Sequence, residues 1–350
     1  MSLLAIRLRQ ARKARGWSLA ALSEAAGGIV TRQALYKYEN ALDIPRSEVL
    51  SALARALGVT VDYFFRPPSH SVTLSEPACR RRARLGKRKF AAIQSEVTNR
   101  IEQWLELEAL FPASRFRLFI CSAEKQRSVE RLEEIESLAK DIRKYLNIGL
   151  SPIENLTELL EDNGVKVISW SGEERDFDGF SCWVNRHVPL IVIKAGLPGD
   201  RQRSNLAHEL GHLVLKPGKA IDPEKAALRF SGAFLVPDEI VYRELGATRH
   251  NLDLPELLSL KQKYGMSIQQ WIYRAKDLGI ITNGYAANLF RFIRARGFHI
   301  KEPGEPLPEE TSSRLRRLAL QAVAEEIVSP ARAAELTGIP IVELRAGIQS

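Results

Sequence analysis

Apolar residues recur at helical spacing along most of the chain. Within the first 65 residues, five short amphipathic segments are separated by turn residues and by side chains suited to helix caps, among them Ser18 and Thr31. A longer segment further on carries Ile93, Val97 and Ile101 at helical spacing, which indicates a helix that faces a core or a dimer seam. The pattern predicts a mainly α-helical protein.

Short apolar runs of strand length are confined to one region, between residues 165 and 195: VKVISW, GFSCWV and PLIVIKA. Their β-branched and aromatic residues predict a small antiparallel sheet. Helical segments precede and follow these runs, and a last helical pair lies beyond residue 311. Because that pair has no basic face, we expect it to pack against the rest of the protein. The predicted fold class is therefore mainly α, and α+β overall.

The sequence His208-Glu209-Leu210-Gly211-His212 lies in a segment of helical periodicity, expected to run from about residue 201 to 215 with Asp200 as its N-cap. Residues four apart share a face of a helix, so His208 and His212 can bind one ion. Glu209 projects about 100° round the helix and can act as general base on a zinc-activated water. This HExxH motif predicts a zinc hydrolase site; the alternative is two ordinary histidines on a half-buried helix.

A third ligand is expected from the next helix, for which Asp222 is the predicted cap and Pro223 the first residue, and which should end before Pro237. Glu224 follows His212 by 12 residues. Two antiparallel helices joined by a short connection would bring its carboxylate over the histidine pair. Alternatively, Glu224 only stabilises the helix dipole. The acids that could then replace it as a ligand are Asp222, Asp238, Glu239 and Glu244.

Composition indicates an ordinary globular protein of two or three domains, with 350 residues, 45% of them hydrophobic and 27% charged. The net charge of +9 is unevenly spread: residues 1–90 hold 17 Lys and Arg against 6 Asp and Glu, and the rest hold 34 against 36. The basic N-terminal quarter is a candidate for contact with nucleic acid; a solvated basic face is the alternative. It ends in a basic cluster at residues 80–89, which could follow phosphates or could equally be the solvated start of the long helix that comes next.

The three cysteines, Cys79, Cys121 and Cys182, are far apart and form no metal-ligand or paired pattern. The N-terminus has no apolar core of signal-peptide length, and no run approaches the length of a membrane span. We therefore expect a cytoplasmic protein with no membrane partner.

A set of positions in the first 66 residues carries the pattern of a known DNA-binding family: Leu8, Arg9, Arg12, Ser18, Leu22, Ala25, Gly27, Gln33, Leu35, Tyr38, Glu39, Pro45, Leu53, Ala54, Leu57 and the terminal GVTVDYFF. With the turn Gly27-Gly28-Ile29-Val30, this segment resembles the XRE (Cro/CI-like) helix-turn-helix family. The resemblance implies a double-stranded DNA operator as partner, and the two-fold symmetry of such operators implies a homodimer.

By this resemblance the third helix lies in the major groove and presents five side chains to DNA: Thr31, Arg32, Gln33, Tyr36 and Lys37. Leu35 and Tyr38 then face the core. The turn is longer than the family's usual one, and Tyr36 replaces a small residue, so the operator sequence cannot be read from the chain.

Residues 129–300 resemble the ImmA/IrrE family of zinc metallopeptidases. The likeness is carried by an ordered set of elements: the helices VERLEEIESLAKDIRKYLN and IENLTELLEDNG, the three apolar runs, RQRSNLAHELGHLVL, EKAALRFSGAFLVP and YGMSIQQWIYRAKDLGII. It implies that His208, His212 and Glu224 bind Zn²⁺ and that Glu209 is the general base. The family often has a second acid two residues after the first, where this chain has Ala226.

Together these patterns predict four parts: a helix-turn-helix domain at 1–66, a basic linker and long helix at 67–128, a metallopeptidase-like domain at 129–300, and a C-terminal helical segment at 301–350. Members of the peptidase family cut or inactivate XRE-like repressors. The fusion therefore implies a DNA-binding regulator with zinc-dependent endopeptidase activity on an XRE-like repressor or on itself, in a stress or mobile-element switch. The region from Arg66 to Phe90 is a natural place for such a cut. The alternative is a transcription factor whose zinc site is structural or sensory and does not turn over.

Overall fold

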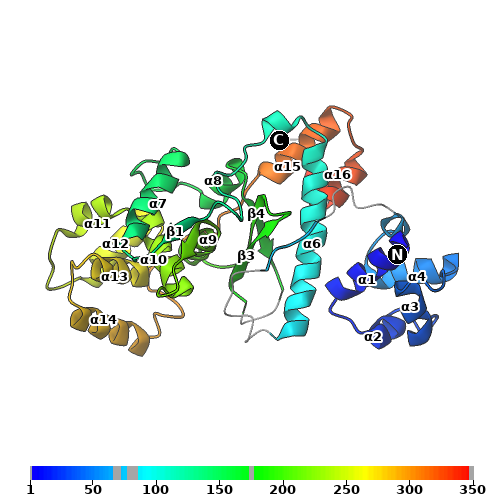
Figure 1. Ribbon diagram of the computed structural model, residues 1–350, viewed down its shortest axis with the longest axis horizontal. Helices are drawn as coiled ribbons and strands as arrows, with labels where there is room; N and C mark the ends of the chain where they lie inside the picture. The colour runs from blue at the N-terminus through cyan, green and yellow to red at the C-terminus, as the bar shows by residue number, and fades with distance from the viewer. Residues whose placement is uncertain (1, 66–71, 77–85, 173–176, 347–350) are drawn as a thin grey trace. The chain divides into compact units, whose positions relative to one another are not determined.

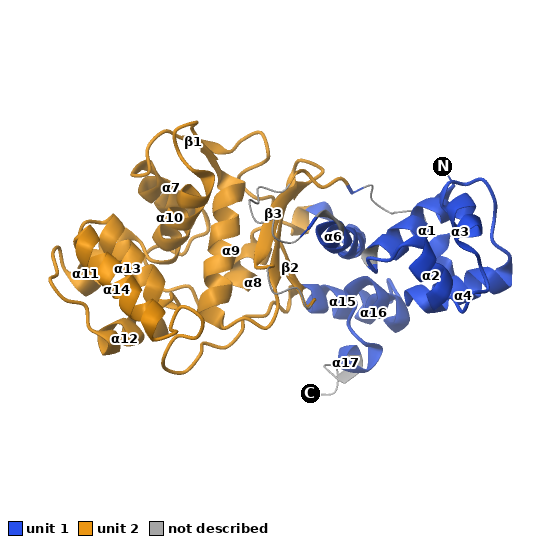
Figure 2. Cartoon of the chain, turned by 90° about the horizontal axis from the view of Figure 1, so that it is seen from below, with its two compact units in different colours: residues 1–72, 81–113, 315–350 blue, residues 73–80, 114–314 orange. Residues whose placement is uncertain are grey.

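The structure is a computed structural model that describes residues 2–65, 72–76, 86–172 and 177–346 (Figure 1). It divides into two units (Figure 2). Unit 1 consists of residues 1–72, 81–113 and 315–350, and unit 2 of residues 73–80 and 114–314. The predicted fold class, mainly α with a small sheet, is confirmed. Cys79 and residues 80–85 of the predicted basic cluster lie outside the described residues.

The N-terminal part of unit 1 is a bundle of five short helices: α1 (Leu3–Ala14), α2 (Leu19–Ala25), α3 (Arg32–Glu39), α4 (Ser47–Leu57) and the 3-10 helix η1 (Val61–Phe64). The predicted caps are confirmed, since Ser18 accepts a hydrogen bond from the N–H of Ala21 and Thr31 from that of Ala34. Fully buried apolar side chains from four of the helices and η1 form the core: Leu8, Leu22, Leu35, Leu53 and Phe64.

The long helix α6 (Lys87–Ala109) packs against α1 within unit 1. Its predicted apolar face, which includes Val97 and Ile101, is buried there. Arg7 on α1 and Glu102 on α6 form a buried ion pair, with 2.6 Å between Nη1 and Oε2. The C-terminal helices complete the unit: α15 (Arg314–Ala324), α16 (Pro330–Thr337) and α17 (Ile341–Ala346). Of these, α16 packs against α6.

The sheet of unit 2 contains β2 (Lys166–Trp170), β3 (Gly179–Val184) and β4 (Val188–Lys194) in the order β2-β4-β3. As predicted, β3 and β4 are antiparallel, but β2 and β4 are parallel. The expectation of an all-antiparallel sheet was therefore wrong for β2. The most continuous apolar run, β4, takes the central position, where both faces are covered, and β3 is left at an edge.

The helices of unit 2 lie mainly to one side of this sheet (Figure 1). They are α7 (Glu134–Tyr145), α8 (Leu156–Asp162), α9 (Gly199–Val214), α10 (Pro223–Leu235), α11 (Asp238–Leu245), α12 (Leu254–Tyr264), α13 (Ile268–Asp277) and α14 (Asn283–Ala295). Shorter elements are η2 (Ala113–Arg115) and the parallel pair β1 (Arg127–Val129) and β5 (Leu215–Pro217). Helix α9 packs against β3 and β4 and also against α10. None of the helices in the described ranges combines the length and apolar content that crossing a membrane requires.

The bounds of α9 and α10 agree closely with the sequence prediction, but the N-cap of α9 is Pro198 and not Asp200. Asp200 instead lies inside the first turn, where its side chain is buried. It forms an ion pair with Lys261 of α12, with 3.1 Å between Oδ2 and Nζ. The local capping signal was therefore overridden by a charge that comes from a distant part of the chain.

Candidate functional site

The close packing of α9 on α10 places the candidate metal-binding residues. Gly211 makes this approach possible, because a Cβ on it would lie 3.2 Å from the Cα of Ala227 and 3.1 Å from Cδ1 of Phe230. At the start of α10, Asp222 accepts a hydrogen bond from the N–H of Glu224, and Pro223 occupies the first turn, as predicted. The first turn of α10 thus presents Glu224 to the histidines of α9.

Three side chains meet at this point: His208, His212 and Glu224. The Nε2 atoms of the two histidines are 3.2 Å apart. Glu224 places Oε2 at 3.3 Å from Nε2 of His208 and Oε1 at 3.6 Å from Nε2 of His212. Among the described residues, these three form the group of His, Cys, Asp and Glu side chains that could hold a metal ion.

These distances fit a tetrahedral ion. Ligand atoms at about 2.0–2.1 Å from zinc in tetrahedral geometry lie roughly 3.3 Å from one another. Burial, and next the neighbouring His208, lower the pKa of His212 to about 4, against the opposite effect of Glu224. His212 is therefore neutral near pH 7, the protonation state in which an imidazole donates a lone pair to a metal. Two imidazole nitrogens and one carboxylate are a donor set that zinc accepts.

Glu209, the predicted general base, is buried beside this group and is 7% exposed. Ser181 on β3 donates its hydroxyl to Oε2 of Glu209 at 2.8 Å. Burial, and next the carboxylate of Glu209, raise the pKa of the adjacent Cys182 to about 12, so its thiol remains protonated. Sequence reasoning missed Ser181, because nothing in the run GFSCWV distinguishes a strand serine that faces α9.

A second residue missed by sequence reasoning supports the far end of α9. The side-chain amide of Gln126 donates to the backbone oxygens of His212 and Leu213, at 2.9 and 3.1 Å. These carbonyls belong to the last turn of the helix, where no backbone N–H of α9 can reach them. Gln126 therefore fixes the turn that carries His212.

The other acids considered as third ligands have different partners. Asp222 caps α10, and Asp238 and Glu239 both pair with Lys140 at 2.7 Å. Glu244 accepts a hydrogen bond from the hydroxyl of Tyr264 at 2.5 Å. Ala226, where the resembled family often has an acid, is fully buried in the core. The geometry thus brings Glu224, and none of the other four acids, to the histidine pair.

In unit 1, the five side chains predicted to meet DNA share the exposed face of α3 and its cap: Thr31, Arg32, Gln33, Tyr36 and Lys37. Leu35 is fully buried, as predicted, and Tyr38 is half-buried. Glu39 at the end of α3 forms a bidentate pair with Arg12 of α1, at 2.6 and 2.7 Å. This contact, in which Glu39 is buried, holds α3 on α1, so the exposed face has a defined orientation.

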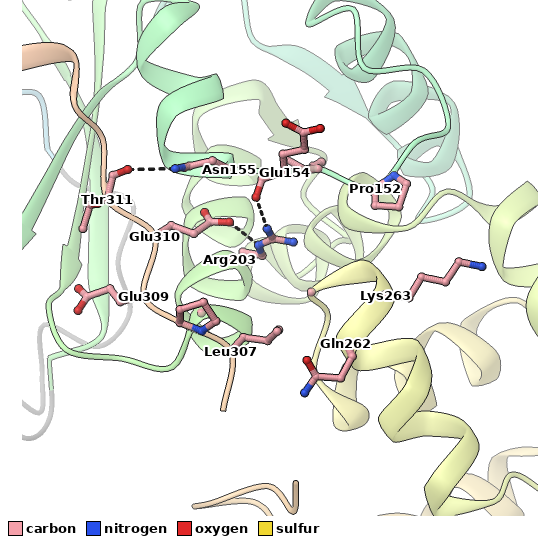
Figure 3. Close-up of a pocket in the computed structure, with 14 residues that line it drawn as sticks. Pro152, Glu154, Asn155, Arg203, Gln262, Lys263, Leu307, Glu309, Glu310 and Thr311 are labelled. Carbon is pink, nitrogen blue, oxygen red and sulfur yellow. Dashed lines mark hydrogen bonds and ion pairs between the residues drawn. The ribbon is translucent and has the colours of Figure 1, made fainter. Parts of the chain in front are cut away.

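A separate cavity of about 480 Å³ lies at the N-terminal end of α9 (Figure 3). Arg203 and Glu310 line it, and they bond to each other at 2.5 Å. Arg203 also donates to the backbone oxygen of Glu154 at 2.7 Å. None of the candidate metal-binding residues lines this cavity. Its polar groups are used to attach the segment around Glu310 to α8 and α9.

Comparison with known families finds two domains in the chain, a helix-turn-helix domain and a metallopeptidase-like domain. Residues 8–64 match the helix-turn-helix family model, and residues 160–276 match the IrrE N-terminal-like domain of peptidase family M78. The resemblance to an XRE-type domain fused to an ImmA/IrrE-like domain is therefore confirmed. The second match includes the HExxH motif and Glu224. Neither a curated protein nor a solved structure matches the chain.

Proposed function

We propose that this chain is a DNA-binding transcriptional regulator with zinc-dependent endopeptidase activity. The observation that carries the proposal is the meeting of His208, His212 and Glu224 at 3.2 to 3.6 Å, with Glu209 buried beside them. The two family matches support it, because they join a helix-turn-helix to a metallopeptidase-like domain in one chain.

His208, His212 and Glu224 would hold Zn²⁺. When bound, the ion would act as a Lewis acid on the scissile carbonyl and lower the pKa of a water to about 7. Three protein ligands leave one position open, which favours a catalytic over a structural zinc site. A fourth protein ligand would close the site, and the described residues offer three.

The protein's own groups would perform the proton transfers. Glu209 would accept a proton from the attacking water and deliver it to the amine that leaves as the peptide bond breaks. The hydrogen bond from Ser181 holds Oε2 of Glu209 and so orients the carboxylate. Because a carboxylate buried with a hydroxyl donor is oriented before substrate arrives, little reorganisation is required during the reaction.

The helix-turn-helix domain would place α3 in the major groove of a duplex operator. Gln33 would bond an adenine edge, and Arg32 and Lys37 would meet bases or phosphates. The exposure of these side chains on one face of a firmly packed helix supports this role. Two copies of the chain would bind a two-fold operator as a dimer.

The substrate would be a protein, either an XRE-like repressor or the chain itself, and the cut would change the occupancy of an operator. The fusion of the two domains supports this substrate class, since a peptidase attached to a DNA-binding domain is brought to the DNA where a repressor binds. Such a chain would act as a stress or mobile-element switch.

The test is metal content and peptide cleavage in three proteins: wild type, the double variant His208→Ala/His212→Ala, and Glu209→Gln. We expect one zinc per chain in wild type and in Glu209→Gln, and none in the double variant. Only wild type should cleave a casein or repressor substrate. Zinc in wild type with equal cleavage by Glu209→Gln would reject the mechanism, and zinc without any cleavage would favour the structural or sensory alternative.

A further inference from the structure

The outer edge of β3 is occupied by a segment from elsewhere in the chain, Thr73–Glu76. Leu74 lies opposite Val184 in an antiparallel bridge. The N–H of Ser75 donates to the oxygen of Trp183, and the N–H of Asn185 donates to the oxygen of Thr73, both at 2.9 Å. Unit 2 therefore carries a short segment bridged to this edge, drawn from the connection that follows the helix-turn-helix domain.

Side chains make the other two hydrogen bonds of this pairing. The N–H of Trp183 donates to Oγ of Ser75 at 3.0 Å, and the N–H of Thr73 donates to Oδ1 of Asn185 at 2.8 Å. In a regular ladder, backbone oxygens take such positions. Among the described residues, the segment therefore pairs with β3 over a single bridge, and an extended peptide with full backbone pairing would form a longer ladder on the same edge.

The same strand leads to the candidate site, because Ser181 of β3 bonds to Glu209. The segment is antiparallel to β3. From the bridge between Leu74 and Val184, Glu76 therefore lies toward Ser181 and Thr73 lies away from it. Strands rise about 3.3 Å per residue, so Val184 and Ser181 are separated by roughly 10 Å along β3. The occupied edge is thus the continuation of the strand that orients Glu209.

We propose that the edge of β3 is the docking site for an extended peptide substrate and that Thr73–Glu76 occupies it in cis as a self-inhibitory strand. The inference rests on the proposed function. It adds the conformation in which the substrate binds and the segment that controls access to the binding edge. Strand addition recognises backbone groups and is tolerant of sequence, so a peptide in trans and the chain's own segment compete for the same donors and acceptors. The covalent connection gives the cis segment a high effective concentration, and a trans peptide must displace it.

The test compares two proline variants of the full-length protein. Ser75→Pro removes the N–H that bonds to Trp183 and the hydroxyl that accepts from it. Glu76→Pro is the matched control, because donors alternate along a strand and its N–H points away from β3. Ser75→Ala is a milder second variant that removes only the hydroxyl, should Ser75→Pro fold poorly.

Two measurements do not require activity. Hydrogen exchange should accelerate at the N–H groups of Trp183 and Asn185 in Ser75→Pro and remain at the wild-type rate in Glu76→Pro. A fluorescent peptide with the sequence of residues 70–80 should bind Ser75→Pro about tenfold more tightly than wild type, as expected if the edge is free in about a tenth of wild-type molecules. Equal exchange and equal affinity in wild type and both variants would overturn the proposal.

Cleavage assays separate this proposal from the proposed function. Faster cleavage of an added substrate by Ser75→Pro than by Glu76→Pro would support both. Tighter peptide binding by Ser75→Pro with no cleavage by any variant would reject the peptidase activity and retain the occupied edge. Cutting of the segment itself in purified wild type, absent in Glu209→Gln, would overturn the inhibitory role, because Thr73–Glu76 would then be a substrate.

Discussion

Gly211 of α9 faces Ala227 of α10 so closely that a methyl group on Gly211 would lie 3.2 Å from the Cα of Ala227. We expect Gly211→Ala to destabilise the protein by about 1–3 kcal/mol, because a buried and close-packed contact must open to admit the methyl group. Since α10 carries Glu224, the same shift should weaken metal binding. Chemical unfolding and a zinc titration measure the two effects.

Gly284 on α14 is the control glycine, because a Cβ there would meet no atom within 4 Å. Gly284→Ala should leave stability unchanged or raise it slightly, since alanine is the better helix former. If both variants had the same stability and the same zinc affinity, close packing at Gly211 would not be what positions Glu224.

Ser181 provides a second test, because its hydroxyl bonds to Glu209 from a different element. Hydrogen bonds to charged groups contribute about 1.5–3 kcal/mol, so Ser181→Ala should lower kcat/KM roughly tenfold to a hundredfold. Zinc content should equal that of wild type, because Ser181 bonds to Glu209, which is not one of the three proposed ligands. Loss of zinc together with activity would show instead that the substitution disturbs the whole site.

The local part of the site could be predicted from the sequence. Helical periodicity, the cap at Asp222 and the HExxH spacing are short-range signals, and they placed α9, α10 and the meeting of Glu224 with the histidine pair. The contacts of Ser181 and Gln126 could not be predicted, since each joins residues distant in sequence. The metal-binding and catalytic roles of the HExxH residues and Glu224 stay predictions.

Tertiary context explains what the sequence could not predict of the fold. The apolar run that forms β2 does not indicate whether it pairs in parallel or antiparallel. In the sheet order β2-β4-β3, β3 lies on the other side of β4, and β2 pairs with β4 in parallel. Asp200 carries a good capping signal, but Lys261 draws its carboxylate into a buried pair. The occupied edge of β3 was also invisible, because the segment around Leu74 has no strong strand pattern.

Lys261 is buried between two carboxylates, Asp200 at 3.1 Å and Glu302 at 2.9 Å. Lys261→Met would leave both acids buried without their cation, and breaking a buried pair in this way costs about 3–5 kcal/mol. Lys263→Met on the same helix is the control: Lys263 is half-exposed and pairs with Glu244, and such a pair contributes at most about 1 kcal/mol. Similar unfolding midpoints for the two variants would contradict this difference.

Glu161 should make stability depend on pH. Burial raises its pKa to about 7, although Ser312, Lys166 and Arg314 act in the opposite direction. A carboxyl group with a folded-state pKa above its unfolded-state value is favourable below the unfolded pKa, and that stability is lost as the pH rises toward the folded pKa. Wild-type stability should therefore decline through this group between about pH 4.5 and pH 7.

Glu161→Gln should remove this decline. Between about pH 5 and pH 8, the unfolding free energy of the variant should gain roughly 2–3 kcal/mol relative to wild type. Urea unfolding of both proteins at each pH measures the gain. A constant difference between the two proteins at both pH values would show that Glu161 does not titrate in this range.

Arg32 and Arg55 are both exposed in the helix-turn-helix domain, but only Arg32 lies on the face of α3 proposed to meet DNA. Arg32→Ala should weaken binding to a mixed-sequence duplex and reduce the slope of log K against log salt by about 1. Arg55→Ala removes the same charge from α4 and should leave the slope close to the wild-type value. Equal slopes in the two variants would place the DNA contact elsewhere.

The packing of α6 on α1 determines whether the two pieces would separate after a cut in the connection between Phe65 and Gly86. Such a cut would divide the chain into two pieces, but the buried pair of Arg7 and Glu102 joins helices on either side of it. The product is a nicked protein whose pieces remain docked. Their separation becomes a bimolecular equilibrium, because the covalent link no longer supplies a high effective concentration. Release of the DNA-binding piece would then depend on dilution, and a nicked sample should co-elute at high concentration and separate at low concentration.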